Sequence, residues 1–222
     1  MQSLIDELKL STPLSTHPYF LDLSSGKITK KQFIDGQLDF YQAVVYFSRP
    51  MMQLASRFEA YHQRWSILEN VLEEHGRGRS ELTHGAQFCL LLNHLGISTQ
   101  TLELHVHHPA VEIFNLTLSA IASQKDWRFA VAVLGMIEDR FSEISAYIGQ
   151  AIVDNAWLTK ERLCHYTLHA KLDVSHAQEF YQLIEKEWNE PDGRIKISQG
   201  LRLGNYLFLD LYRQLWLIYT AT

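Results

Sequence analysis

The sequence predicts an all-α protein built as a single bundle of about seven to nine helices. Apolar residues recur at helical spacing along most of its 222 residues, and no stretch alternates apolar and polar side chains between turn signals as a strand would. Only five prolines interrupt the chain, so long segments are free of helix breakers. Neither a repeat nor a linker rich in Pro, Gly or Ser divides it. We therefore expect residues 1–222 to form one domain.

Capping residues mark where several helices begin and end. Thr29 and Asp126 are each suited to cap a long helix, and Gly96 is suited to stop one that follows Ser80. The proline-containing segment 11–25 is expected to be a loop. The predicted helices cover residues 3–10, 30–47, 61–75, 81–94, 109–123, 127–153, 160–171, 173–188 and 193–218, with a further segment opening at Pro50.

Composition argues against several classes of function. The formal net charge is −5 and Lys and Arg form no run, which argues against a nucleic-acid partner. The longest apolar run, Phe129–Ile137, is far too short to cross a bilayer. No basic stretch precedes an apolar one near residue 1, and Cys89 and Cys164 are too few for a disulfide framework. We expect a cytoplasmic protein without nucleic-acid or membrane partners, acting on a small molecule as a monomer or a homodimer.

The strongest local motif is His169-Ala-Lys-Leu-Asp173-Val-Ser-His176. Its steps of four and three residues bring both histidines and the aspartate onto one helix face. We expect His165, one turn earlier, to face the same cavity as a group that supports the ligands. Imidazole and carboxylate together suit iron, manganese or zinc, and di-iron sites in helical bundles use such side chains on facing helices. The motif indicates a metal site, although a solvated helix face can show the same spacing.

Two other segments carry ligand-type residues. Glu74 ends one predicted helix, and His84 lies in the first turns of the next, beyond the break at 76–78. Glu138 interrupts an otherwise apolar helix, where a carboxylate is costly to bury unless it is paired or bound to a cation. The alternative for Glu138 is a position at the edge of the apolar face.

Three glutamates could accompany His84. Glu81 precedes it by three residues, which is the Glu-x-x-His spacing of ferritin-like di-iron sites. Glu74 requires the glycines at 76 and 78 to bend the chain so that one helix end and the next helix start face one ion. Glu73 ranks last, because it points about 100° away from Glu74 around the helix. We favour Glu74 and keep Glu81 as the alternative ligand.

Along the chain the candidate ligands follow the order Glu, His, Glu and then His-x3-Asp-x2-His. This order resembles that of the haem-oxygenase-like di-iron oxidases and oxygenases, in particular the branch containing the Chlamydia protein associating with death domains. His17-Pro18-Tyr19-Phe20 and the aromatic segment 40–47 extend the similarity over nearly the whole chain. The resemblance implies a haem-oxygenase-like bundle, related to the TenA-like and PqqC-like proteins, that uses two Fe2+ ions and O2 on a small organic substrate; manganese is the alternative metal. The ligands that it implies are Glu74, His84, Glu138, His169, Asp173 and His176.

Reactions implied by the resemblance include oxidation of amino acids or fatty acids, N-oxygenation, and formation of p-aminobenzoate from a tyrosine of the protein itself. That last reaction implies a nearby lysine, and no Lys lies between Glu138 and Lys160. Two other classes stay open: a metal-independent TenA-like or PqqC-like enzyme, and a non-enzymatic interaction protein. The TenA-like enzymes use a Cys nucleophile, but Cys89 and Cys164 lie in predicted helices without an activating neighbour. A binding module would not need six ligand-type residues in register.

Overall fold

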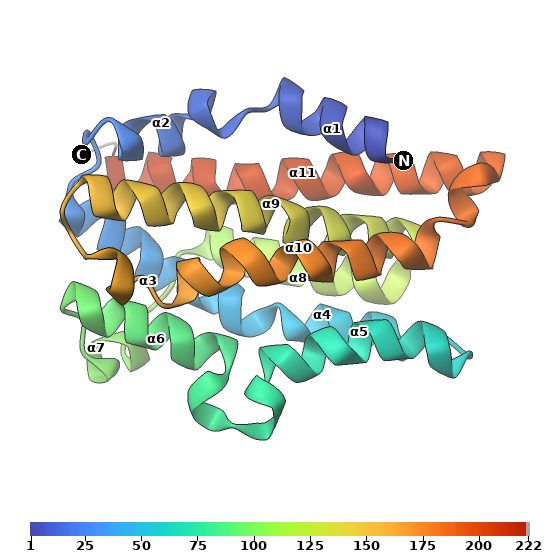
Figure 1. Ribbon diagram of the computed structural model, residues 1–222, viewed down its shortest axis with the longest axis horizontal. Coiled ribbons are helices and arrows are strands. Elements are labelled where there is room, and N and C mark those ends of the chain that lie inside the picture. The colour runs from blue at the N-terminus through green and yellow to red at the C-terminus, as the bar shows by residue number, and fades with distance from the viewer. Residues whose placement is uncertain (221–222) are drawn as a thin grey trace.

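A computed structural model describes residues 1–220, and all of its regular structure in that range is helical. The predicted all-α class is therefore confirmed, and the helices pack side by side as a bundle (Figure 1). None of the described helices is long and apolar enough to cross a membrane. The α-helices are α1 (Gln2–Ser11), α2 (Pro18–Ser24), α3 (Lys30–Tyr46), α4 (Ser48–Ala55), α5 (Tyr61–Glu74), α6 (His84–Leu95), α7 (Thr99–Glu103), α8 (Pro109–Gln124), α9 (Trp127–Asp154), α10 (His165–Ile184) and α11 (Pro191–Thr220).

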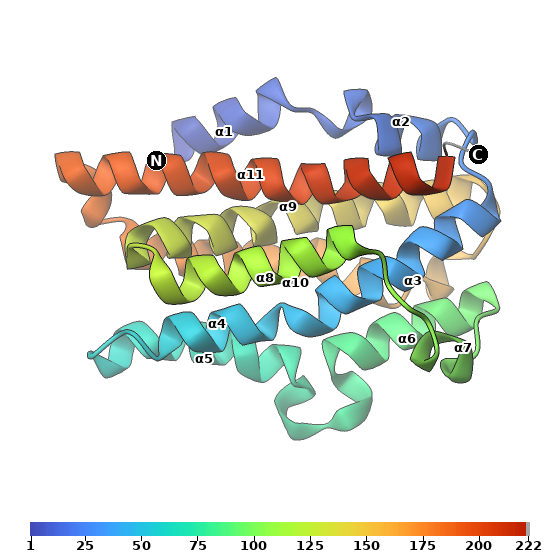
Figure 2. The same cartoon turned by 180° about the vertical axis from the view of Figure 1, so that it is seen from behind.

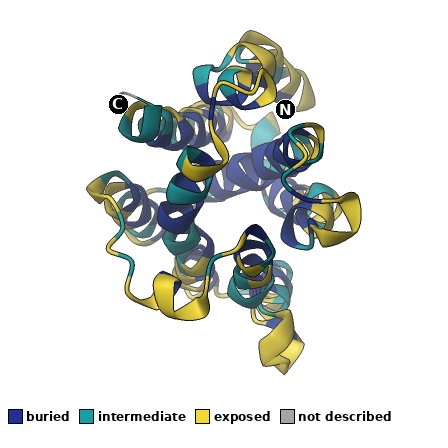
Figure 3. Ribbon diagram, turned by 90° about the vertical axis from the view of Figure 1, so that its left-hand side faces the viewer, coloured by how far each residue is buried: buried dark blue, intermediate teal, exposed yellow. Residues whose placement is uncertain are grey.

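Helix α9 forms the centre of the bundle, and most of its residues are buried. It packs along α10 and α11, its two most extensive neighbours, and also contacts α8 and α4. Figure 2 shows α3, α4 and α8 on the opposite side from α10, with α1 and α2 lying along α11. Viewed along the bundle, the buried residues of the surrounding helices face a common interior (Figure 3). A side chain from the middle of α9 therefore points into a space that several helices enclose.

The segment from residue 159 to 188 differs from the prediction of two helices. Thr159 precedes a single 3-10 turn, Lys160–Arg162, and α10 then runs unbroken from His165 to Ile184. No helix-breaking residue lies near position 172, so the expected division there had no physical cause. One continuous helix fixes the relative positions of all the side chains on its inner face.

Helices α9 and α10 approach closely at Gly135. A Cβ added there would lie 2.9 Å from Phe180 Cβ and 3.0 Å from Tyr181 Cε1, closer than packed carbon atoms allow. Gly135 is one turn before Glu138, and Phe180 is one turn after His176. The absence of a side chain at position 135 thus brings these two ligand-type residues within reach of each other.

The link between α5 and α6 makes the bend that the glycine break predicts. Gly76, Arg77 and Gly78 all have positive φ angles, of 62°, 51° and 84°. A Cβ on Gly76 would lie 2.8 Å from the backbone of Leu82 and Thr83, so glycine is required both for the angle and for the close approach. The link projects from the bundle between the two helices (Figure 1). It returns the chain so that α6 begins close to where α5 ends.

The helix signals were accurate at some ends and wrong at others. Thr29 forms a capping box, Asp126 accepts from the backbone of α9, and Gly96 ends α6 with φ 104°, all as predicted. Ser80 was expected to cap α6, but Thr83 does so, because residues 80–82 form a separate 3-10 turn. Within the segment expected to be a loop, α2 begins at a proline, which suits a first helical turn. The short helix α7 was not predicted.

Candidate metal centre

The inner face of α10 carries the predicted motif. His169, Asp173 and His176 are 2%, 1% and 2% exposed, so all three project into the bundle rather than into solvent. The alternative of a solvated helix face is therefore wrong. Charged or titratable side chains are rarely buried without partners. The side chains that face these three come from the helices packed against α10.

The other predicted ligands reach the same interior from three helices. Glu138 comes from the middle of α9, Glu74 from the last residue of α5, and His84 from the first residue of α6. Each is less than 10% exposed. His84 Nδ1 lies 2.5 Å from Glu74 Oε2, whereas Glu81 is exposed on the 3-10 turn that precedes α6. The bend at residues 76–78 thus brings Glu74, and not Glu81, to His84.

The ligand-type atoms gather in two adjacent groups. In each group, one nitrogen or oxygen atom per residue lies within 4.8 Å of the others, which is close enough to surround one metal ion. One group is rich in carboxylate and the other contains only imidazole. The first consists of Glu138, Asp173 and His176, and the second of His84, His165 and His169.

Unpartnered atoms in these groups test whether a metal fits. Five of the six predicted ligands carry a buried nitrogen or oxygen atom without a hydrogen-bond partner in the described chain. An unpartnered buried polar atom is costly and uncommon in native proteins. Because these atoms converge from three helices, a cation is the partner that they fit. The atoms are His84 Nε2, Glu138 Oε1, His169 Nε2, Asp173 Oδ2 and His176 Nδ1.

A carboxylate orients each of the three predicted histidine ligands. Besides the pair of His84 and Glu74, His169 Nδ1 lies 2.9 Å from Asp173 Oδ1, and His176 Nε2 lies 2.7 Å from a carboxylate of α5. In each ring the other nitrogen is the unpartnered one. Histidines that bind metals are commonly held this way, with the second nitrogen bonded to a carboxylate that fixes the ring and its tautomer.

The carboxylate that binds His176 belongs to Glu73, the glutamate that ranked last. Adjacent residues point in different directions from a helix, but the end of α5 packs against α10 near the start of α6. Glu74 therefore reaches His84 while Glu73 reaches His176. Arg77 binds the side chains of both Glu73 and Glu69 and holds this end of the helix in place. The sequence signal for Glu73 was its position beside Glu74; its contact depends on tertiary packing.

Burial shifts the pKa values of Glu138, Asp173 and His169 in the directions that favour their uncharged forms. It raises the pKa of Glu138 well above the ordinary value, and the neighbouring Glu74 and Glu179 raise it further. The pKa of Asp173 rises for the same reason, with Glu138 and Glu74 adding to the effect. Burial lowers the pKa of His169 well below its ordinary value, and nearby imidazoles lower it further. With no positive side chain among them, these groups favour a bound cation, which would stabilise carboxylates and neutral imidazoles alike.

A small apolar cavity of about 30 Å³ adjoins the centre. Its polar contributors are His84 and Glu138, so a molecule inside it would contact the centre directly. The remaining lining is aromatic or aliphatic: Phe40, Ala43, Val44, Phe47, Phe114, Ile137, Phe141 and Phe208. This volume suits a molecule of about the size of water or O2, and a larger substrate requires these side chains to move.

The two cysteines lack an activating arrangement. Cys164 Sγ lies 3.6 Å from His94 Nδ1, but that nitrogen also lies 2.9 Å from the carbonyl oxygen of Arg162 and so donates its proton there. Burial raises the pKa of the Cys164 thiol, which opposes formation of the nucleophilic thiolate. Cys89 is a free thiol in α6. Neither cysteine supports the metal-independent, nucleophilic alternative.

Comparison with known proteins agrees with this chemistry. A family described as iron-containing redox enzymes matches residues 38–207 of the chain, a span that includes all six predicted ligands. The 4-aminobenzoate synthase of Chlamydia muridarum is 23% identical over 210 residues, covering 94% of this chain and 88% of the relative.

Solved structures share the fold. A domain of unknown function with a haem-oxygenase-like fold from Shewanella denitrificans superposes with a TM-score of 0.78 at 15% identity, covering 99% of this chain and 90% of that one. A CADD-like protein of unknown function from Nostoc punctiforme gives 0.76 at 14% identity and covers 96% of each chain. At 14–15% sequence identity, these similarities show that the fold is shared and nothing further.

Proposed function

This chain belongs to the haem-oxygenase-like family of iron-containing redox enzymes, and from that premise we propose that it binds two ferrous ions and uses O2 to oxidise a small organic substrate. The observation that carries the proposal is the convergence of five unpartnered ligand atoms from α6, α9 and α10 in a buried space. Hydrogen bonds among residues 1–220 do not satisfy these atoms, and a pair of cations would.

The proposed ligands differ in charge and therefore in the role that they would have at the metal ions. Three carboxylates, Glu74, Glu138 and Asp173, offset most of the four positive charges of two ferrous ions, and three neutral imidazoles supply further donor atoms. Bound in this way, iron would supply the electrons and the open coordination positions that O2 reduction needs. Glu73 holds His176 by its Nε2 atom, so that Nδ1 remains free to face the centre.

The phenylalanine-lined cavity supports the choice of a small, largely apolar substrate or co-substrate. Its aromatic and aliphatic lining gives water few hydrogen-bond partners in the space beside His84 and Glu138. Exclusion of water strengthens electrostatic interactions within the site and limits side reactions of reactive oxygen species. Manganese is the alternative metal, because the carboxylate ligands also suit it.

Formation of 4-aminobenzoate is the second candidate, favoured by the name of the relative from Chlamydia muridarum. If a tyrosine of the chain is consumed, Tyr166 is the candidate, because it follows His165 and their ring centroids are 5.0 Å apart. Its hydroxyl donates to Gln37, which in turn donates to Tyr19. Helix α9 contains no lysine, so the nitrogen would have to come from elsewhere. Release of 4-aminobenzoate by the iron-loaded protein, measured by mass spectrometry, tests this candidate.

The main proposal is tested by loading the protein with Fe2+ without oxygen and then adding O2. We expect rapid O2 consumption and an absorption change that depend on Asp173, with both lost in Asp173→Asn. Asp6→Asn is the matched control, because Asp6 is exposed on α1, outside the centre. Equal O2 consumption by wild type and Asp173→Asn would contradict the proposal.

A further inference from the structure

His165 belongs to the buried cluster but stands outside the six predicted ligands. Its side chain is 0% exposed, and neither Nδ1 nor Nε2 has a hydrogen-bond partner among residues 1–220. A neutral imidazole has one donor and one acceptor nitrogen, and burying both without partners is costly. Like the proposed ligands, the ring therefore carries buried polar atoms without a partner, and in His165 this is true of both nitrogens.

Within the described part of the chain, the side chains around His165 are mostly aromatic and give these nitrogens no hydrogen bond. Phe88 meets the ring edge-on at 4.7 Å between centroids, and Phe141 lies at 5.7 Å. Tyr166 is also adjacent, but its hydroxyl already donates to Gln37. Aromatic rings thus surround His165 on several sides. The polar rings nearest to it are the imidazoles of His84 and His169.

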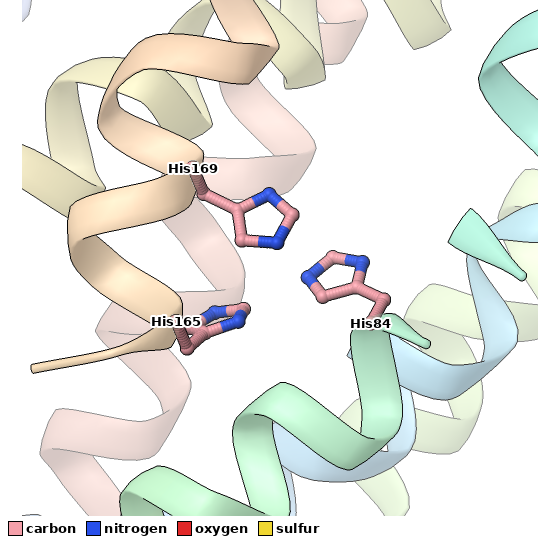
Figure 4. Close-up of side chains that lie close together, drawn as sticks. All are labelled: His84, His165 and His169. Atoms are coloured by element: carbon pink, nitrogen blue, oxygen red, sulfur yellow. The ribbon is translucent and has the colours of Figure 1, made fainter. Parts of the chain in front are cut away.

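Those imidazoles face His165 across a short gap. The ring centroid of His165 lies 4.5 Å from that of His169 and 4.9 Å from that of His84. One nitrogen from each of the three rings lies within 4.8 Å of the others. Figure 4 shows the rings of His165 and His169 projecting from one helix toward His84 on another. Three imidazole nitrogens gathered this closely form a donor set that suits a divalent first-row metal.

The backbone before α10 turns His165 into this gap. Cys164 has φ 43° and ψ −96°, a conformation that residues other than glycine rarely adopt. Helix α10 begins at the next residue, which sets His165 one turn before His169. Strained backbone of this kind persists where the surrounding structure holds it, and it is concentrated at functional sites.

We propose that His165 is a metal ligand that joins His84 and His169 in holding one of the two divalent ions. The proposal rests on the proposed function, because it assigns a seventh ligand to the same centre. The two positions then differ in chemistry: one gathers three imidazoles, and the other is rich in carboxylate. Imidazole suits zinc, copper, iron and nickel, whereas carboxylate suits manganese and magnesium as well. The imidazole position therefore selects more strongly among first-row metals.

The first test counts histidine ligands without altering the chain. Protein labelled with 15N in its histidines is loaded with Zn2+, which is diamagnetic, and the ring nitrogens are observed by long-range proton–nitrogen correlation NMR. We expect four histidines to show nitrogen shifts typical of metal coordination. Three such histidines in a protein that has bound two ions would overturn the assignment of His165 and leave the proposed function standing.

The second test removes the nitrogens and keeps the ring. In His165→Phe we expect one of two metal-binding steps to weaken about 10–100-fold or more, with the other step unchanged, in calorimetric titrations with Fe2+ and Zn2+. His62→Phe is the control, because His62 is exposed in the first turn of α5. His165→Gln covers the case in which the phenylalanine variant fails to fold. Two unchanged steps in a folded variant would overturn the inference, and a wild-type protein that binds no metal would overturn the proposed function with it.

Discussion

The imidazole of His84 lies face to face with that of His169, with ring centroids 3.9 Å apart and ring planes inclined by 19°. The two residues come from α6 and α10, so tertiary packing alone brings them together. Two protonated rings at this distance would repel each other, and both burial and the proximity of His84 lower the pKa of His169. Burial and the neighbouring ring thus favour the neutral form of His169, which is the form that binds metals.

Removal of the charge of Glu138 should stabilise the metal-free protein and weaken its binding of iron. Because the pKa of Glu138 is raised in the folded state, the folded chain binds a proton at this carboxylate more tightly than the unfolded chain does. The free energy of unfolding therefore falls as the pH rises from the ordinary value of 4.5 through the folded pKa. Glu138→Gln avoids this loss, and we expect a gain of roughly 1–3 kcal/mol at pH 7–8.

Thermal unfolding of metal-free wild type and Glu138→Gln at pH 4 and at pH 8 measures this effect. The two proteins should melt at similar temperatures at pH 4, where Glu138 is protonated in both states, and the variant should melt higher at pH 8. Iron affinity should fall in the same variant. A lower melting temperature for Glu138→Gln at pH 8 would show that the buried carboxylate stabilises the metal-free fold.

A side chain at position 135 should separate α9 from α10. Gly135→Ala places a carbon 2.9 Å from Phe180 Cβ, and overpacking of this kind typically costs about 1–3 kcal/mol. Because Glu138 and His176 flank this contact, iron affinity should fall as well. Denaturant unfolding together with iron titration measures both effects.

Gly149 on the same helix is the matched control for Gly135. A Cβ at position 149 would lie 3.5 Å from Leu163 Cδ1, an ordinary contact. Gly149→Ala should therefore be neutral or stabilise the helix by up to about 1 kcal/mol, with iron binding unchanged. Equal losses of stability in the two variants would refute the close-approach argument.

Glu74 and Glu81 should differ sharply in their effect on iron. Glu74→Gln removes a buried carboxylate that contacts His84, and we expect iron affinity to fall about 10–100-fold or more. Glu81→Gln removes an exposed charge on the preceding turn and should leave affinity unchanged. Anaerobic Fe2+ titration of both variants measures the difference, and the reverse pattern would favour the Glu-x-x-His alternative.

Much of the centre could be predicted because it depends on spacing within one helix. The steps of four and three residues from His169 to His176 set a common face whatever the rest of the fold does. The isolated Glu138 was noticeable because an apolar helix seldom buries an unpaired carboxylate. The glycines at 76 and 78 indicated a bend because few other residues adopt the backbone angles it needs.

The remaining features depend on contacts between helices, which periodicity does not encode. Glu73 meets His176 because of where α5 packs against α10. The predicted start of α10 lay several residues early, so the strained turn at Cys164 was not foreseen, although helical spacing placed His165 on the same face as His169. Both residues are polar neighbours of predicted ligands, and only the packed structure shows what each side chain contacts.

The central claim is that one chain holds two iron ions, and an anaerobic Fe2+ titration of the purified protein tests it most directly. Iron bound per chain is measured after removal of the free metal, in wild type and in His176→Ala. We expect about two ions per chain in wild type, in keeping with the di-iron centres of helical bundles, and a clear loss of binding in the variant. Wild-type protein that binds no iron, or the same two ions bound with equal affinity in His176→Ala, would contradict the account.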